Sequence, residues 1–312
     1  MSYRAGDHHA LLYRLPGTSM SSYRYVAYTS TEGAAEMKDS VSAHYSHGQL
    51  LEHIRRGVEA IGKTAATVTV DELAPVDEFH IGGRQASEDF ISQLDLSADD
   101  HTLDVGCGIG GTSRFVANRF GCRVTGIDLT PEFVSTGQTL CDWVGLSSKV
   151  ELQQGDATAM PFTDESFDAA FMLHVGMNIA NKGDLFAEVY RLIKPGAFFG
   201  VYDVMKTSDE TLTYPVPWSS VPGTSALATQ DQYVKALEQT GFDIIKIRDR
   251  RDFAAEFFAE TRRQMEEAGG APPLGVHIAM GESAPIKIDN MVENIASGRV
   301  SPVEIIVCKT AH

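Results

Sequence analysis

Short apolar runs recur along the chain and alternate with longer stretches in which apolar residues follow a helical spacing. The short runs predict seven strands, at residues 102–105, 123–128, 150–154, 169–173, 197–204, 242–248 and 303–308. Strands that alternate with helices in this way form a mostly parallel sheet with helices on both faces. The sequence therefore predicts an α/β fold.

Several helices have recognisable starts or faces. Residues 50–61 carry apolar side chains at the i, i+3, i+4, i+7 spacing of an amphipathic helix, and residues 87–96 predict another. Residues 67–83 contain a proline and a glycine pair, so we expect a loop there. The Thr130-Pro131 pair predicts a helix capped by the threonine hydroxyl, and Thr229 with Gln232 forms a capping box.

The chain divides into three parts by composition. Residues 1–38 are rich in Ser, Tyr, Gly and Thr, and we expect a flexible arm. Residues 39–98 are expected to form a helical lid segment, and residues 99–312 the main domain. Insertions at 205–230 and 252–300 interrupt this domain. The second is far longer than the ten to twelve residues, roughly, that a crossover needs, so we expect a helical cap before the last strand.

Charge and composition exclude several classes of function. The chain has 26 Lys and Arg against 42 Asp and Glu, a net charge of −16, which disfavours a nucleic-acid partner. No apolar run approaches the ~20 residues of a membrane span, and the N-terminus lacks the apolar core of a signal peptide. The 4 cysteines form no C-x-x-C pair, and no metal-ligand spacing is present, so we expect a cytoplasmic protein without a metal.

A glycine-rich segment is the clearest chemical signal. Gly106, Gly108 and Gly111 follow a predicted strand and precede a predicted helix, where backbone N–H groups can approach a ligand closely. Asp128 ends the next strand, about twenty residues further on, where an acid can hold ribose hydroxyls. This arrangement predicts a nucleotide-like cofactor, either NAD or S-adenosylmethionine.

Two acidic residues distinguish between these two possible cofactors. Asp104, within the strand that leads into the glycine segment, suits a cationic ligand and hinders an anionic pyrophosphate. S-adenosylmethionine carries a sulfonium and an ammonium and no phosphate. Asp156 follows the third strand, where an acid and the next backbone N–H can hold adenine. These residues favour S-adenosylmethionine over NAD.

Four motifs resemble the class I S-adenosylmethionine-dependent methyltransferases that act on small molecules (methyltransferase type 11). They are DVGCGIGG (104–111), VTGIDLTPEFV (124–134), GDATAMPFTDESFDAAFMLHV (155–175) and EVYRLIKPGAFFGVYD (188–203). SAHYSHGQLL, DEFHIGG and YPVPWSS are similar to sarcosine/dimethylglycine N-methyltransferases and, more distantly, to ubiquinone/menaquinone C-methyltransferases. The resemblance implies a Rossmann-like seven-stranded sheet with an N-terminal helical lid and a helical cap.

The resemblance also implies roles for individual residues. The cofactor site would comprise Asp104, Gly106, Gly108 and Gly110 at the methionine part, Asp128 at the ribose, Leu129, Asp156 and Ala157 at the adenine, and Leu173. Candidate catalytic residues are His174, His80 and Tyr45. Candidate substrate residues are Trp218, Asn178 and Arg251, the last as a partner for a carboxylate. Each candidate has a purely structural alternative, such as core packing or a solvated surface.

The function predicted from these observations is transfer of a methyl group from S-adenosylmethionine to a small molecule, leaving S-adenosylhomocysteine. An amine nitrogen of sarcosine/dimethylglycine type is the first choice of acceptor. Carbon or oxygen methylation of a quinone-like or natural-product acceptor is the alternative. An NAD-dependent oxidoreductase and a binding module without catalysis are alternatives from other classes. The oligomeric state stays open, with a homodimer as one alternative.

Overall fold

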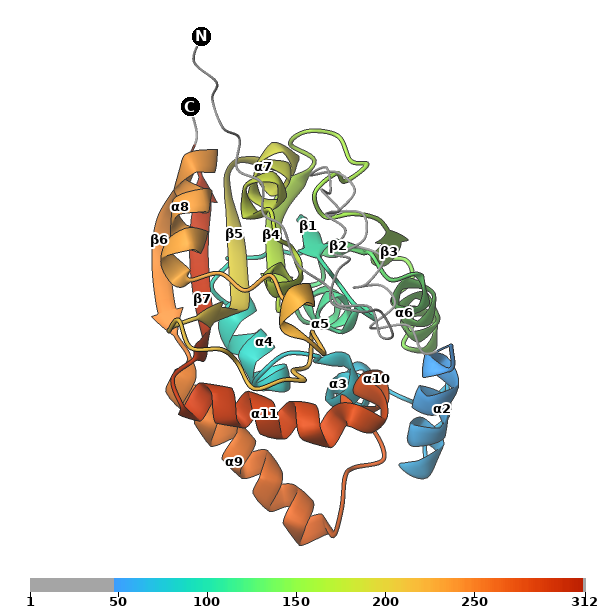
Figure 1. Cartoon of the computed structure of the whole chain (residues 1–312). Helices are drawn as coiled ribbons and strands as arrows, with labels where there is room; N and C mark the ends of the chain where they lie inside the picture. Colours follow the sequence, from blue (N-terminus) through green and yellow to red (C-terminus); the bar gives the residue numbers. More distant parts are fainter. Residues whose placement is uncertain (1–47, 311–312) are drawn as a thin grey trace, which may run out of the picture.

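A computed structural model of the chain describes residues 48–310. The predicted arm (1–38) and Tyr45 lie outside the described residues. The described part contains a seven-stranded sheet in the order β3-β2-β1-β4-β5-β7-β6 (Figure 1). The strands are β1 (His101–Val105), β2 (Arg123–Asp128), β3 (Val150–Gln154), β4 (Phe167–Leu173), β5 (Ile193–Lys206), β6 (Phe242–Asp249) and β7 (Val300–Lys309).

This sheet confirms the fold class predicted from the sequence. Neighbouring strands from β3 to β5 pair in parallel, whereas β7 runs antiparallel to both β5 and β6. All seven predicted strands are present, and β2 and β3 have the predicted bounds. β5 and β7 are longer than predicted. They pair with each other from Phe198 opposite Cys308 to Lys206 opposite Val300, and Ile193 at the start of β5 pairs with Phe167 of β4.

Helices cover both faces of the sheet, and the side chains of single strands alternate between them. One face packs on α7 (Lys182–Leu192) and α8 (Gln230–Thr240). The other packs on α4 (Gly83–Ile91), α5 (Gly111–Phe120) and α6 (Pro131–Trp143). In β4, for example, Ala170 and Met172 pack in the core on the face covered by α7 and α8, and Phe171 between them packs on the opposite face.

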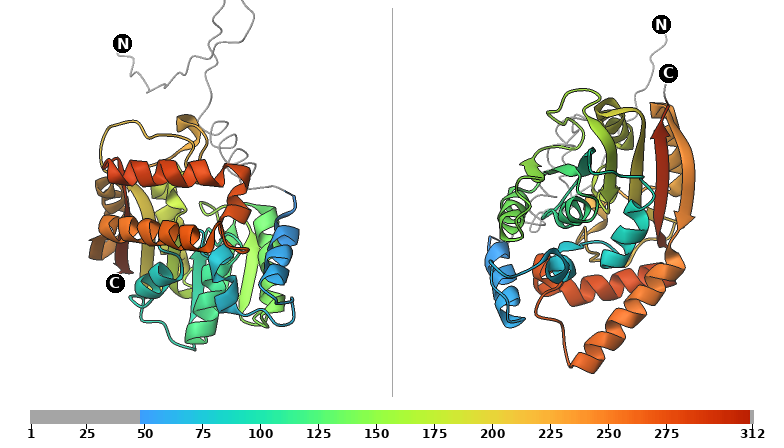
Figure 2. Two further views of the ribbon diagram at one scale, coloured as in Figure 1. Left: turned by 90° about the horizontal axis from the view of Figure 1, so that it is seen from below. Right: turned by 180° about the vertical axis from the view of Figure 1, so that it is seen from behind.

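The remaining helices gather beyond the end of the sheet where the parallel strands finish (Figures 1 and 2). They are α2 (Leu50–Ala60), α3 (Val70–Asp77), α9 (Arg251–Ala268), α10 (His277–Met280) and α11 (Ala284–Ala296), and the short 3-10 helices are η1 (Gly176–Asn178), η2 (Pro222–Thr224) and η3 (Gly281–Ser283). Figure 2 shows α9 and α11 side by side across this end. The ligand site of an open α/β sheet lies at this same end.

The expected loop at 67–83 is wrong for its central part, which forms α3. Thr69 and Glu72 make a capping box there, with the Glu72 N–H 3.3 Å from the Thr69 hydroxyl and the Thr69 N–H 3.0 Å from Glu72 Oε2. Pro75 lies inside the helix. A proline there costs about 3 kcal/mol, but complete burial of Leu73 and Val76 recovers about 1.5–3 kcal/mol each. Packing therefore outweighs the proline signal.

The predicted helix starts have mixed outcomes. The capping box of Thr229 and Gln232 at the start of α8 is confirmed. α6 begins at Pro131 as predicted, but the Thr130 side chain makes no cap hydrogen bond to the helix. Asp128 instead holds the residue before the helix, because its Oδ1 accepts the Thr130 N–H at 2.8 Å. The aspartate two residues earlier in the chain therefore controls the entry to this helix.

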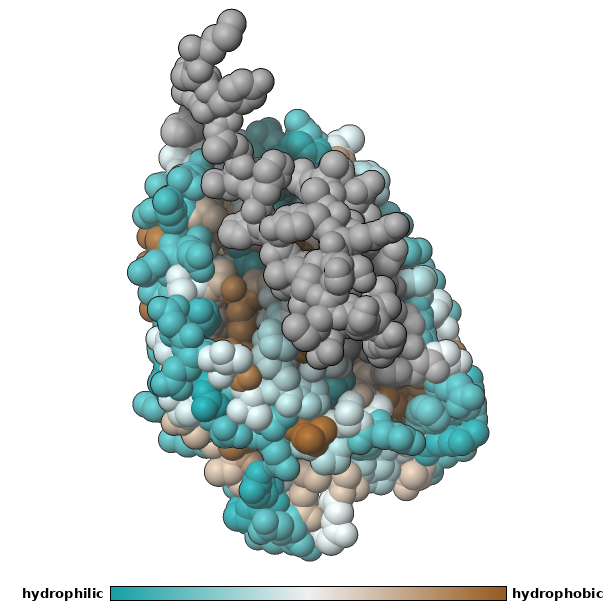
Figure 3. Space-filling model, in the orientation of Figure 1, coloured by the Kyte–Doolittle hydropathy of each residue, from teal (hydrophilic) through white to brown (hydrophobic). Residues whose placement is uncertain are grey.

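The described surface is mainly polar. On the face in Figure 3, hydrophilic side chains dominate and hydrophobic ones form small separate patches. Across residues 48–310, no helix combines the length and the apolar character needed to span a bilayer.

Candidate active site

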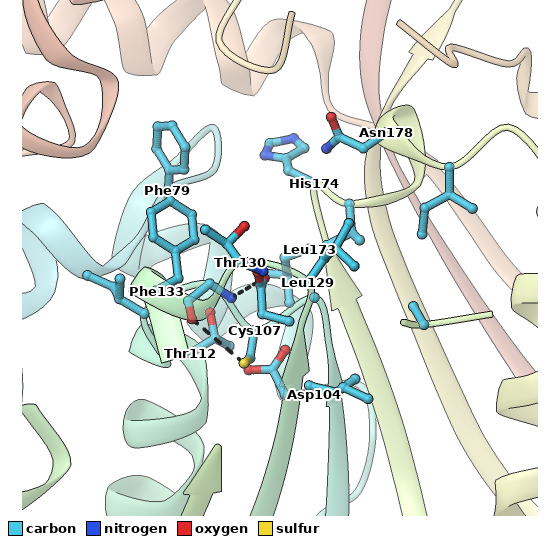
Figure 4. A pocket seen from close by; sticks show the side chains of 18 of the residues that line it. Phe79, Asp104, Cys107, Thr112, Leu129, Thr130, Phe133, Leu173, His174 and Asn178 are labelled. Atoms are coloured by element: carbon cyan, nitrogen blue, oxygen red, sulfur yellow. Dashed lines mark hydrogen bonds between the residues drawn. The ribbon is translucent and has the colours of Figure 1, made fainter. Parts of the chain in front are cut away.

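A cavity of about 800 Å³ lies at the carboxyl ends of β1, β2 and β4, with its lining drawn in Figure 4. Eleven of the residues predicted from the sequence line this cavity: His80, Asp104, Gly106, Gly108, Asp128, Leu129, Asp156, Ala157, Leu173, His174 and Asn178. They come from positions spread over about a hundred residues of the chain. The parallel sheet brings them together because its strands all finish at this edge.

The glycine segment lines one side of the cavity. Gly106 and Gly108 have φ angles of +73° and +54°, which glycine adopts without strain. A Cβ atom on Gly106 would come within 2.4 Å of the Val175 side chain. A Cβ on Gly108 would have no atom of the described residues within 4 Å and would project into open space. Gly108 therefore leaves room for a ligand to approach the backbone.

Gly110 has a different position from the one expected. It does not line the cavity; it is the left-handed residue that precedes α5, with φ +76°. A Cβ there would lie 2.6 Å from the Leu152 side chain. The structure thus gives Gly110 a part in packing the glycine segment against the strand layer.

Asp104 is an almost fully buried carboxyl group beside this segment, only 3% exposed. The Ser113 hydroxyl donates a hydrogen bond of 2.6 Å to its Oδ2. Burial raises the pKa of Asp104 to about 7, an effect that the Ser113 hydrogen bond opposes and the nearby Asp128 increases. A cation would stabilise the ionised form, because its opposite charge favours the carboxylate.

Asp128 holds the backbone as well as lining the cavity. Its Oδ2 accepts the Gly108 N–H at 2.9 Å, while Oδ1 accepts the Thr130 N–H. Burial raises the pKa of Asp128, and these two backbone hydrogen bonds lower it. Each carboxylate oxygen has two lone pairs, so the group retains capacity for ligand hydroxyls. The sequence predicted the acid at this place but not its contact with the glycine segment.

His174 follows β4 in a constrained position. Its φ is +53°, uncommon for a residue other than glycine, and its backbone N–H donates to the Tyr202 carbonyl at 2.7 Å. The ring Nδ1 accepts the Ile81 N–H at 3.2 Å, so the neutral ring carries its proton on Nε2. Burial, and to a lesser extent His80, holds the pKa of His174 well below its usual range. His174 is therefore a neutral imidazole.

His80 is a second neutral imidazole on the same wall. Its Nε2 lies 3.2 Å from the Gly83 carbonyl oxygen, which can only accept, so Nε2 carries the proton. Burial lowers the pKa of His80 to about 4. Its ring centroid is 5.9 Å from that of His174. In the neutral ring, Nδ1 of His80 keeps a lone pair that no described residue uses.

The structure does not bring two predicted substrate residues to the cavity. Trp218 is 3% exposed in a separate core cluster, and its Nε1–H donates to the Ser225 hydroxyl at 3.0 Å. Arg251 begins α9 and donates to the Thr207 hydroxyl. No Lys or Arg occurs in the lining among the described residues. Within that same part of the chain, no cluster of His, Cys, Asp and Glu has a metal-binding arrangement.

Several lining residues were missed from the sequence. Phe79 and Phe133 form one wall of the cavity in Figure 4, and Ala279 reaches it from the cap helix α10. Asp77 also lines it and makes an ion pair of 2.6 Å with Arg114, with both side chains fully buried. The capping box of α3 was the available signal, because it indicates a helix start in this segment; the helix ends at Asp77, and Phe79 follows two residues later.

The seven-stranded sheet and its helices have the fold of solved methyltransferase structures. Residues 103–201 match the family model described as a methyltransferase domain. In sequence, the chain is similar to a sterol 4-C-methyltransferase of Caenorhabditis elegans, 37% identical over 117 residues, which are 38% of this chain and 35% of the relative. The chain thus spans about a third of the length of that relative.

Two solved structures have the same fold at low identity. One is a Galdieria sulphuraria protein assigned as a sarcosine dimethylglycine methyltransferase, with a TM-score of 0.59, 17% identity, and coverage of 72% of this chain and 86% of that one. The other is geranyl diphosphate C-methyltransferase from Streptomyces coelicolor, solved with Mg²⁺, geranyl diphosphate and S-adenosylhomocysteine. It has a TM-score of 0.62 and 18% identity and covers 88% of this chain and 98% of that one. Both likenesses concern the fold.

Proposed function

We propose that the protein transfers a methyl group from S-adenosylmethionine to a small-molecule acceptor. The observation that carries this proposal is the set of three acids, Asp104, Asp128 and Asp156, which line one cavity with the glycine segment of a methyltransferase domain. Acids along a cavity without Lys or Arg in its described lining suit a cofactor with cationic groups. They oppose the pyrophosphate of NAD.

The described residues fit this cofactor. Asp104, Gly106 and Gly108 would hold the methionine part, because a buried carboxyl group with an open backbone beside it matches an ammonium. Asp128 would take the ribose hydroxyls. Leu129, Asp156, Ala157 and Leu173 complete the proposed cofactor set. When bound, the cofactor supplies a methyl group on a sulfonium, which a nucleophile can attack.

The protein's own contribution is alignment and exclusion of water. Phe79, Phe133 and Val175 give the cavity apolar walls, and correct alignment alone can supply about 7–11 kcal/mol of a barrier. Of the two described histidines, His80 has the free Nδ1 lone pair that can accept a proton from the acceptor. His174 has none, because Ile81 occupies its Nδ1. We therefore propose His80 rather than His174 as the proton acceptor, a weak base because burial lowers its pKa to about 4.

For the acceptor, we favour carbon or oxygen methylation of a neutral molecule over methylation of an amine. A sarcosine or dimethylglycine substrate carries a carboxylate, and Arg251, its expected partner, is held at Thr207 away from the cavity. The similar sterol methyltransferase is named for methylation of carbon. The net charge of −16 supports a small molecule rather than nucleic acid, and we retain a cytoplasmic location as part of the proposal.

Titration calorimetry with S-adenosylmethionine, S-adenosylhomocysteine and NAD tests the cofactor. We expect micromolar binding of the first two and none of NAD. Binding of NAD without binding of S-adenosylmethionine would overturn the proposal.

Turnover with methyl-labelled cofactor then separates the acceptors. The panel contains sarcosine, dimethylglycine, a sterol, a prenyl diphosphate and a quinol. Methyl label in the sterol or quinol supports a neutral acceptor, whereas label in sarcosine supports an amine acceptor. Binding of the cofactor without label transfer to any member supports a binding module.

A further inference from the structure

Two buried polar atoms at the cavity have no hydrogen-bond partner. Nε2 of His174 and Oδ1 of Asn178 are shielded from solvent, and no described residue bonds to either. Both residues line the cavity, and Figure 4 draws both side chains at the rim formed by the segment after β4. Burying a polar atom without a partner is unfavourable. Two such atoms in one cavity lining therefore indicate a ligand that pairs with them.

The surroundings of His174 make it a hydrogen-bond donor. The Ile81 N–H uses the Nδ1 lone pair, which leaves Nε2–H as the ring's remaining polar group. Tyr202 fixes the ring from another side, with ring centroids 4.9 Å apart, and its hydroxyl donates to the Ile81 carbonyl. His174 is thus held on two sides, and neither ring nitrogen has a lone pair available to take a proton from a substrate.

Asn178 supplies the complementary acceptor. Its backbone N–H donates to the Val175 carbonyl at 2.9 Å and closes the short helix η1 four residues after His174. Its side-chain amide makes no hydrogen bond with a described residue. The left-handed conformation of His174 starts this turn, and backbone strain of this kind gathers at ligand sites.

We propose that His174 and Asn178 together bind a hydroxyl group of the methyl acceptor. The hydroxyl oxygen accepts from His174 Nε2–H, and its own hydrogen is donated to Asn178 Oδ1. A hydroxyl both accepts and donates, so it pairs with both atoms, whereas an ammonium only donates and would leave the His174 Nε2–H unpaired. Phe79 and Phe133 offer an apolar wall for the rest of the molecule. The substrate class is a neutral, hydroxylated, partly apolar small molecule.

The identification of the ligand as the methyl acceptor rests on the proposed function. The pairing of a hydroxyl group with His174 and Asn178 does not depend on it. The test uses phenol, toluene and benzoate, three probes of similar shape. Their dissociation constants are measured by ligand-observed NMR on the full-length protein, with and without S-adenosylhomocysteine. We expect phenol to bind at least as tightly as toluene, and benzoate to bind most weakly.

Two variants remove the pair one member at a time. His174→Phe and Asn178→Leu should each shift the ratio of phenol to toluene affinity toward toluene by about tenfold, because an unpaired hydroxyl is then buried. His53→Phe, which alters an exposed histidine on α2, is the matched control and should leave the ratio unchanged. A ratio that changes less than about twofold in both variants overturns the inference.

A second measurement does not depend on variant folding. Long-range proton–nitrogen NMR spectra of the unmodified protein should show the His174 proton on Nε2, and a proton on Nδ1 contradicts the proposal. Failure of the two proposals is distinguishable. If S-adenosylhomocysteine does not bind but phenol selectivity and its loss in the variants are found, the proposed function falls and the pair stands. If S-adenosylhomocysteine binds and phenol selectivity is absent, the pair falls and the proposed function stands.

Discussion

Single carboxyl groups set the charge of this cavity, and their partners decide how each behaves. Asp104 has one hydroxyl donor, from Ser113, and its pKa rises to about 7. Asp128 has two backbone N–H donors, which also position the glycine segment and the start of α6. The first group can respond to a cationic ligand near neutral pH, whereas the second holds the backbone and is proposed to bind the ribose hydroxyls.

The charge of Asp104 should make cofactor binding depend on pH. Below about pH 7 the group is protonated and no longer attracts a cation. We therefore expect the affinity for S-adenosylmethionine to fall roughly eightfold from pH 7.5 to pH 6, as the ionised fraction falls. Asp104→Asn should remove this dependence, as measured by calorimetry across that range. An unchanged slope in the variant would assign the effect to another group.

The same pKa shift also makes the stability of the ligand-free protein depend on pH. Stability falls as pH rises, whereas the affinity for the cofactor increases. The folded pKa of Asp104 is raised above its unfolded value, so its contribution to stability is largest at acidic pH and is lost as pH rises through about 7. Asp104→Asn should therefore stabilise the protein more at pH 8 than at pH 5, with a difference of up to about 2–3 kcal/mol. Urea unfolding at both pH values measures it. Equal effects at both would show that Asp104 ionises normally.

Asp128→Ala should weaken S-adenosylmethionine binding by about 1–3 kcal/mol, because hydrogen bonds to a charged group are lost. It also removes the acceptor for the Gly108 N–H, so unfolding is measured alongside binding. Asp99→Ala is the control: this exposed acid lies just before β1, at the opposite end of the sheet. An unchanged dissociation constant in Asp128→Ala would remove Asp128 from the cofactor site.

Among the elements, α3 is joined to the glycine segment through a buried ion pair. Its C-terminal end carries Asp77, and the Asp77–Arg114 ion pair joins it to α5. Arg114 Nη1 also donates to the Ile109 carbonyl at 2.7 Å, within the glycine segment. A helix that precedes the sheet in sequence therefore braces the loop proposed to bind the cofactor.

Arg114→Met should destabilise the fold by about 3–5 kcal/mol, because it leaves Asp77 buried without its charged partner. Adding Asp77→Asn should recover part of that loss by removing the uncompensated charge. Arg119→Met, an exposed site on the same helix, should change stability by less than about 0.5 kcal/mol. Chemical denaturation of the three variants tests this coupling. If Arg114→Met is as mild as Arg119→Met, the buried pair does not brace the glycine segment.

At the scale of the whole molecule, one apolar cluster joins parts that are distant in sequence. It contains Ile54 of α2, Leu73 of α3, Ile109 of the glycine segment, Phe133 of α6, and Leu274 of the cap. Phe133 and Ile109 also line the cavity. Folding of α2, α3 and the segment that contains Leu274 is therefore energetically connected to the shape of the site.

Leu274→Ala should cost about 2–5 kcal/mol, because this side chain is 2% exposed and packs against Gly57 of α2. It should also weaken cofactor binding, since the cluster continues into the glycine segment. Ile286→Ala, at a 52% exposed residue of the same cap, should stay within about 0.5 kcal/mol. Loss of stability with unchanged cofactor affinity would show that the cap and the site are independent.

The sequence by itself determined the strands, the glycine segment and the positions of its acids. Each depends on local features: the spacing of apolar residues, glycine between a strand and a helix, and an acid at the end of a strand. Eleven of the lining residues were also predicted, most of them through the family resemblance, and the converging strand ends of the parallel sheet bring most of them together. β2 and β3 were predicted to the residue.

Only the tertiary structure decided what depends on contacts between distant segments. Burial of Leu73 and Val76 formed α3 around Pro75, core packing removed Trp218 from the cavity, and the Ile81 N–H gave His174 its tautomer. None of these has a local signature, because each results from which surfaces the fold buries together. The sequence thus determined a sheet with a glycine-rich loop, and packing determined the wall that we propose receives the methyl acceptor.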